Sequence, residues 1–274
     1  MKKRKRVVRA GNLVWATICT PPAPNDAEHV RAAKSRATTA ARKALNQRAA
    51  SRRLEMLLAA NFTSRDFHLI LTYRPSDLPA KRQEAVKRLR KFLAQLRAYR
   101  KARGLPLKYV YATEGMHGDK NFHHHLVINA TAGDYDLIRS LWIWGDQIDF
   151  ERIADRDYSG LARYLTKEAA EGKPNGAQSW TPSRGLTKPT VETSWVDGDE
   201  TLTAPAGCYV IEREDKQNEF AGYSYIHYRV EQPQPRKTRP RRSKDSFTYT
   251  ADTIRNRRAY APACEGLKLP KRQF

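Results

Sequence analysis

The stretch LKYVYATE-GMHGDKN-FHHHLVIN, residues 107–129, decides the fold. Its outer parts, residues 107–114 and 122–129, are rich in aromatic and β-branched side chains. The part between them is polar and contains two glycines. Two such runs around a glycine-containing turn predict an antiparallel β-hairpin.

The segments on either side of this hairpin alternate between strand and helix patterns. FHLILTY (67–73) and residues 147–153 predict strands. Apolar residues at helical spacing predict helices over residues 80–103, 135–144 and 158–171. The order β-α-β-β-α-β predicts an α+β, ferredoxin-like (split βαβ) fold. We expect an antiparallel sheet with helices on one face and the other face free for a site.

Charge is concentrated at the two ends of the 274-residue chain. The net charge is +22, of which +11 lies in residues 1–60, +9 in residues 233–274 and only +2 between them. Residues 28–60 are rich in Ala, Arg and Lys and lack Pro and Gly, which favours a helix. Residues 232–244 are basic and proline-rich, which favours disorder. We therefore expect a basic N-terminal arm or helix (1–60), a main domain (61–189), a β-rich extension (190–232) and a basic tail (233–274).

Composition excludes several classes of protein. Hydrophobic residues make up 40% of the chain, too many for wholesale disorder or collagen. No run reaches the roughly 18 apolar residues of a membrane span, and we expect no signal peptide. Three distant cysteines fit a reducing cytoplasm better than a disulfide framework. The positive excess indicates a polyanionic partner, most commonly nucleic acid, or else a merely solvated basic surface.

The three consecutive histidines indicate a metal site. Because side chains alternate along a strand, His123 and His125 share one face and His124 points into the core. In a hairpin without a bulge, Glu114 faces His123 on that same side. Two imidazoles and a carboxylate suit Mn²⁺ or Mg²⁺. Exposed histidines without a ligand, a structural zinc, and competition from His117 in the turn are the alternatives.

The predicted helix over residues 158–171 contains a second motif, YLTK. Tyr164 and Lys167 lie three residues apart and share one helical face. A phenol near positive charge and a divalent metal is a candidate nucleophile, because the charge favours the phenolate. Packing of Tyr164 against Leu161 and Leu165 is the alternative.

Taken together, these motifs resemble those of the HUH endonucleases. LILTY, then TE followed eight residues later by HHH and LVIN, and then YLTK occur in this order within residues 61–189. Within the superfamily, the chain is most similar to the rolling-circle replication initiators of small phages and plasmids. The resemblance implies Glu114, His123 and His125 as metal ligands.

The resemblance also implies that Tyr164 is the nucleophile and Lys167 the helical lysine. Some members use two tyrosines. Here Tyr158 lies six residues before Tyr164 instead of the three or four that would share a face. We therefore expect a single-tyrosine enzyme.

What the resemblance implies about function is specific. It implies a metal-dependent endonuclease that nicks and rejoins single-stranded DNA at a replication origin through a 5′-phosphotyrosine. No phosphate-cradling GxxxxGK[ST] motif occurs, so a host helicase, with a host polymerase, would be a further partner. The expected location is the cytoplasm of a bacterial host of a phage or plasmid. The alternatives are a transposase or relaxase with the same chemistry, a non-catalytic basic nucleic-acid-binding protein and, more distantly, a metal-dependent RNase.

Overall fold

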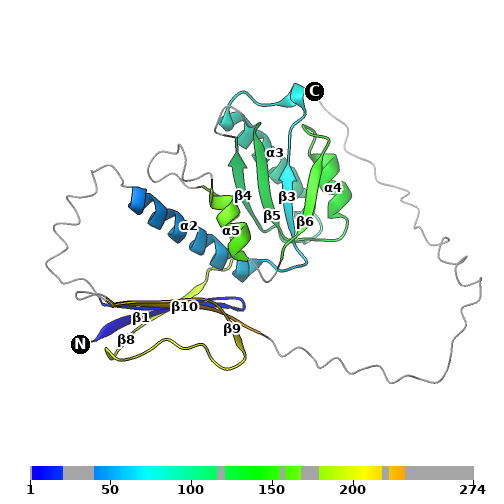
Figure 1. Cartoon of the computed structure of the whole chain (residues 1–274). Helices are drawn as coiled ribbons and strands as arrows, with labels where there is room; N and C mark the ends of the chain where they lie inside the picture. The colour runs from blue at the N-terminus through cyan, green and yellow to red at the C-terminus, as the bar shows by residue number, and fades with distance from the viewer. Residues whose placement is uncertain are drawn as a thin grey trace, which may run out of the picture. The chain divides into compact units, whose positions relative to one another are not determined.

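The computed structural model describes residues 2–20, 40–115, 121–154, 158–167, 179–217 and 222–231. They lie within one compact unit, Met1–Pro233, which holds two five-stranded antiparallel sheets and four α-helices in its described part (Figure 1). The elements in chain order are β1 (Lys3–Ala10), β2 (Leu13–Cys19), α2 (Ala40–Asn61), β3 (Phe67–Leu71), the 3-10 turn η2 (Pro75–Asp77), α3 (Arg82–Lys101), β4 (Tyr109–Glu114), β5 (His123–Ile128), α4 (Asp134–Leu141), β6 (Ile148–Arg152), α5 (Tyr158–Thr166), β7 (Thr181–Pro182), β8 (Thr190–Val196), β9 (Cys208–Gln217) and β10 (Gly222–Val230).

One sheet has the strand order β6-β3-β5-β4-β7. Its first four strands, with α3 and α4 between them, give the β-α-β-β-α-β order and confirm the predicted ferredoxin-like plan. All neighbouring strands in this sheet are antiparallel. The observed bounds of these elements differ from the predicted ones by a few residues.

One face of this sheet packs against α3 and α4. Leu89, Phe92 and Leu96 of α3 are fully buried against sheet residues such as Leu69 and Leu126. Their helical spacing turns one stripe of α3 inward and leaves most of its basic side chains outside.

The end of α3 is tied to the start of α4 by a buried ion pair. Arg100 is completely buried, and its guanidinium donates to the carboxylate of Asp134 at 2.7 Å and to Asn129 at 2.8 Å. Burial lowers the pKa of Arg100, while Asp134 opposes this effect. One of the ten basic residues predicted on this helix therefore holds the fold together and does not face solvent.

The opposite face of the sheet was expected to be free, and this expectation is wrong for about half of it. Val110, Ala112 and Val127 are buried beneath α2 and α5, with Leu54 and Leu58 of α2 in the same core cluster. Figure 1 shows α2 beside α5. The end of this face that bears Glu114 and His123 stays partly exposed.

The second sheet has the order β8-β1-β2-β10-β9. The sequence predicted strand pieces at 208–213 and 223–230, which correspond to β9 and β10, but not β1 or β2. At the β1–β2 turn, Gly11 has a φ of +56°, and a Cβ there would collide with the carbonyl of Ala59 in α2. This close approach packs the second sheet against the same core cluster as α2.

Several predictions concern residues outside those that the structure describes. They are the first part of the 28–60 helix, the end of the helix predicted over 158–171, and the basic tail from residue 233. The division of the chain into four parts stays a prediction.

Candidate active site

The β4–β5 hairpin brings Glu114, His123 and His125 to one side of the sheet. The strands pair Glu114 with His123 and Ala112 with His125, which is the predicted register without a bulge. Directly after Glu114, Gly115 has a φ of +104°, a conformation that other residues rarely adopt. The chain therefore leaves the strand immediately after the carboxylate.

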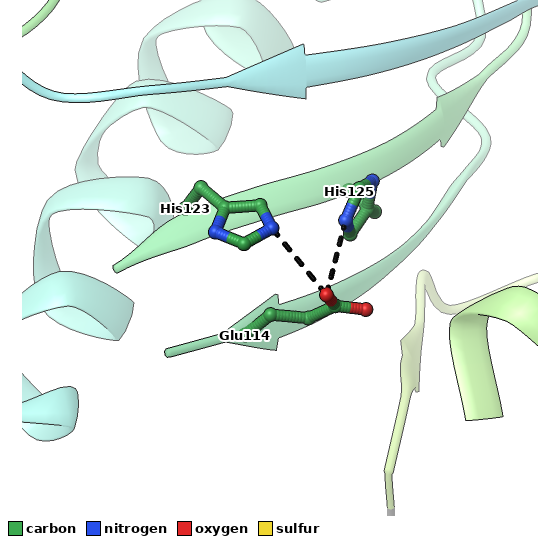
Figure 2. A group of neighbouring side chains, drawn as sticks. All are labelled: Glu114, His123 and His125. Atoms are coloured by element: carbon green, nitrogen blue, oxygen red, sulfur yellow. Dashed lines mark ion pairs between the residues drawn. The ribbon is translucent and has the colours of Figure 1, made fainter. Parts of the chain in front are cut away.

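The three side chains form a group with the spacing of a metal site. Figure 2 shows the Glu114 carboxylate directed toward both imidazoles, with Oε2 3.4 Å from Nε2 of His123 and 3.5 Å from Nε2 of His125. One donor atom from each residue lies within 4.8 Å of the others. The side chain of His125 is 1% exposed and that of His123 22%, so the group is accessible from one side.

A buried nitrogen shows that this group fits a divalent cation. Nε2 of His125 is buried and forms no hydrogen bond with any residue that the structure describes, because the 3.5 Å contact to Glu114 is poorly placed for one. A buried nitrogen without a partner is costly, and a cation would satisfy it. A carboxylate with two imidazoles is also a common donor set for Mn²⁺ and related ions.

Two further residues, which the sequence did not single out, orient His125. Nδ1 of His68 lies 3.0 Å from Oε2 of Glu151, and Nε2 of His68 lies 3.2 Å from Nδ1 of His125. A carboxylate can only accept, so Nδ1 of His68 donates and its Nε2 accepts from Nδ1 of His125. This arrangement leaves a lone pair on Nε2 of His125, the atom that faces Glu114.

The signal for this relay was present but incomplete. His68 lies on β3 opposite Val127, on the same face as His125. The alternation of FHLILTY therefore places His68 on one side of the sheet. Its partner Glu151 lies on β6, and only the order of the strands brings the two together.

Burial and charge act in opposite directions on Glu114. Burial alone would raise its pKa, but hydrogen bonding and positive charge from His123 and His125 outweigh burial and lower the pKa to about 2. Glu114 is thus held as a carboxylate, the form that binds cations.

The middle histidine of the triplet belongs to the core, as the alternation predicted. His124 is fully buried, with Nδ1 2.9 Å from Thr113 Oγ1 and Nε2 2.7 Å from the hydroxyl of Tyr73. Burial lowers its pKa to about 3. His117, the competing ligand, lies outside the described residues.

Helix α5 brings Tyr164 to the edge of the Glu114–His123–His125 group. The ring centroid of Tyr164 lies 4.9 Å from that of His125 and 6.4 Å from that of His68. Tyr164 remains 45% exposed. The phenol therefore sits beside a candidate metal ligand and is open to solvent.

Tyr158, at the start of α5, has a different environment. It is 5% exposed, and its hydroxyl donates to the backbone carbonyl of Phe62 at 2.6 Å. Its buried position agrees with the expectation that only one tyrosine acts.

Lys167 lies next to Tyr164 in a pocket of about 460 Å³ between α5 and α2. The Lys167 side chain is exposed. The remaining lining residues are Gln47, Arg48, Ser51, Gly160, Arg163 and Thr166. Three basic side chains, including Lys167, thus surround the phenol-bearing face of α5.

Comparison with protein families gives one match. The model of the ORF2-type replication-associated protein family matches residues 66–169, which include the hairpin with Glu114, His123 and His125 as well as Tyr164 and Lys167. No curated protein and no solved structure is detectably similar to the chain. The family match supports a role in replication initiation and interaction with DNA. In the described part of the chain, no helix is long and apolar enough to cross a membrane.

Proposed function

We propose that this chain is a metal-dependent tyrosine endonuclease of the HUH type that nicks and rejoins single-stranded DNA to start rolling-circle replication. The observation that carries the proposal is the position of Tyr164, whose ring lies 4.9 Å from that of His125. A candidate nucleophile thus adjoins a candidate metal group. The replication-family match over the same residues supports this proposal.

Glu114, His123 and His125 are the residues that would hold Mg²⁺ or Mn²⁺. A divalent cation bound there would supply Lewis-acid polarisation of a phosphate oxygen. The relay from Glu151 through His68 keeps His125 in the tautomer that ligates through Nε2.

Tyr164 is the proposed nucleophile. Its phenolate oxygen attacks the scissile phosphorus, the bond from phosphorus to the 3′ oxygen breaks, and that oxygen takes up a proton as a 3′-hydroxyl. The product is a 5′-phosphotyrosine, which preserves one phosphodiester bond and can be reversed by a 3′-hydroxyl. Lys167, exposed in the same pocket, would stabilise the phenolate and the phosphate.

The basic surface supplies the grip on the single strand. The exposed face of α3 carries Lys87, Arg90, Lys91 and Arg97, and the chain ends account for most of the net positive charge. These charges bind phosphates through counterion release and without sequence preference.

The nucleophile is tested by covalent trapping. The full chain is incubated with Mn²⁺ and an end-labelled, random-sequence pool of single-stranded oligonucleotides, and adducts are resolved on a denaturing gel. We expect an adduct with the wild type and with Tyr135→Phe, which alters an exposed tyrosine on α4, but none with Tyr164→Phe.

Two results would contradict the proposal. An adduct that persists in Tyr164→Phe would overturn the assignment of the nucleophile. A wild type that binds the pool without forming any adduct would favour a non-catalytic nucleic-acid-binding protein. The same gel with double-stranded target DNA and a strand-transfer acceptor separates replication from transposition or conjugative transfer.

A further inference from the structure

A second, larger pocket of about 700 Å³ lies between α2, α5 and the sheet that contains β1 and β2. We propose that it binds one nucleotide of the single DNA strand whose neighbouring phosphate reaches Tyr164. This inference rests on the proposed function but concerns residues with no part in the proposed chemistry. The residues that carry it come from α2, α5, β2, β9 and β10.

The first reason is that this nucleotide pocket adjoins the Tyr164 pocket. Arg48 and Ser51 of α2 and Arg163 of α5 line both. Both arginines are exposed. A strand that passes between them could therefore present one phosphate to Tyr164 and place the adjacent nucleotide in the larger pocket.

The second reason is the pairing of positive charge with aromatic rings inside the pocket. The guanidinium of Arg52 lies 4.8 Å from the ring centre of Trp15 and 4.9 Å from that of Tyr225. Arginine planes and aromatic rings are the surfaces on which proteins stack unpaired bases. Trp15 is only partly buried, so part of its surface is accessible.

The third reason is a buried polar atom at the wall of the pocket. His227 is 7% exposed, and its Nε2 forms no hydrogen bond with any described residue. It lies 3.6 Å from Oε1 of Glu55, which is too far for a hydrogen bond. A ligand group entering the pocket would give this nitrogen a partner.

The mixture of charges selects the ligand class. Four arginines line the pocket together with three glutamates, at positions 48, 52, 163 and 213 and at positions 55, 212 and 214. A bare polyphosphate would be repelled by the carboxylates. A nucleotide satisfies both sets, because its phosphate meets arginines while the edge of its base offers N–H donors and ring acceptors.

The test measures binding without cleavage. The full chain with Tyr164→Phe is titrated into a fluorescein-labelled, random-sequence 30-nucleotide single-stranded pool with chelator present. We expect additional Arg48→Ala to weaken binding by about tenfold, the effect of losing one charge-assisted phosphate contact. It should also reduce the slope of log K against log salt by about 1.

The matched control is Arg139→Ala. Arg139 is exposed on α4, lies over the ring of Tyr135 and is outside both pockets. It removes the same charge, so we expect its affinity to stay within a few-fold of the parent. Equal losses in the two variants would show a nonspecific effect of net charge and overturn the proposal.

A second measurement does not depend on stability. The same pool containing 5-iododeoxyuridine is photocrosslinked to the Tyr164→Phe chain, and the crosslinked peptides are identified by mass spectrometry. We expect crosslinks at Trp15. Crosslinks confined to α3 and the hairpin, with none on β2 or β10, would overturn the proposal.

Failure of this inference is distinguishable from failure of the proposed function. Covalent adducts at Tyr164 without crosslinks at Trp15 would remove the nucleotide pocket and leave the nickase. Crosslinks at Trp15 without adducts would support the pocket and remove the nickase. A chain that binds no single-stranded DNA would overturn both.

Discussion

His68 and His125 lie on neighbouring strands with Nε2 of the first 3.2 Å from Nδ1 of the second. Because Glu151 accepts from the other side of His68, both hydrogen bonds run in one direction. The relay fixes which nitrogen of His125 is available to a cation. This relationship links a residue at the far edge of the sheet to the proposed metal group.

Loss of His68 should therefore weaken metal binding. His68→Leu keeps an apolar side chain in a buried position but removes the acceptor for His125. We expect Mn²⁺ affinity to fall about 10- to 100-fold, the usual effect of losing such a supporting contact. Isothermal titration without DNA measures it. Asp136→Ala, an exposed carboxylate on α4, is the control for Glu151→Ala, which should show a smaller loss than His68→Leu.

Removal of a proposed ligand should separate chemistry from binding. His123→Ala is expected to abolish Mn²⁺-dependent adduct formation while affinity for single-stranded DNA stays within a few-fold, because most of the grip comes from basic residues elsewhere. Gel trapping and fluorescence anisotropy measure the two quantities. Adduct formation that survives exhaustive chelation would exclude a role for a metal.

The buried His124 predicts a pH dependence of stability. Its pKa is lowered by burial from 6.5 to about 3, so below pH 6.5 the unfolded chain binds a proton that the folded chain does not. Stability contributed by neutral His124 is full above pH 6.5 and is lost as the pH falls toward 3. In His124→Asn, the slope of unfolding free energy over this window should be shallower by up to about 1.4 kcal/mol per pH unit.

Urea unfolding from pH 7 to pH 4 measures this slope. His227→Asn is an informative comparison, because burial lowers the pKa of His227 in the other sheet as well. An unchanged slope in His124→Asn would mean that His124 does not titrate differently in the folded state.

The buried ion pair between Arg100 and Asp134 should be important for stability. Asp134→Ala leaves the fully buried guanidinium without its carboxylate, and we expect a loss of about 3–5 kcal/mol in unfolding free energy. Asp136→Ala on the same helix is exposed and should change it by less than about 0.5 kcal/mol. Similar values for the two variants would contradict a structural role for the ion pair.

Tyr158 should matter for stability and not for chemistry. Tyr158→Phe removes one buried hydrogen bond to the carbonyl of Phe62, at a cost of about 1 kcal/mol. Adduct formation should be unchanged at a temperature where the variant is folded. A loss of adducts comparable to that of Tyr164→Phe would instead indicate a two-tyrosine mechanism.

Local patterns in the sequence were sufficient for the main domain and for the grouping of its candidate ligands. The two-residue alternation in FHHHLVIN and the short hairpin determine that Glu114, His123 and His125 share one side, and the observed register agrees. The helical spacing of Leu89, Leu93 and Leu96 likewise predicted the buried stripe of α3.

Features that depend on distant strands were not predictable in this way. Glu151 reaches His68 only because β6 pairs with β3, and no local pattern states that pairing. The strand β2 was missed for the same reason, since one of its two neighbours is β10 near the other end of the described chain. The covered half of the sheet followed from α2, whose docking surface includes both sheets.

The central place of β2 has a consequence for synthesis of the protein. Leu13 pairs with Arg229, so one edge of the β1–β2 hairpin lacks its neighbour until nearly all of the described chain has left the ribosome. At translation rates of about 5–20 residues per second, that interval is roughly 10 to 40 seconds. The main domain, encoded between these strands, can therefore fold first, and the second sheet is completed last around it.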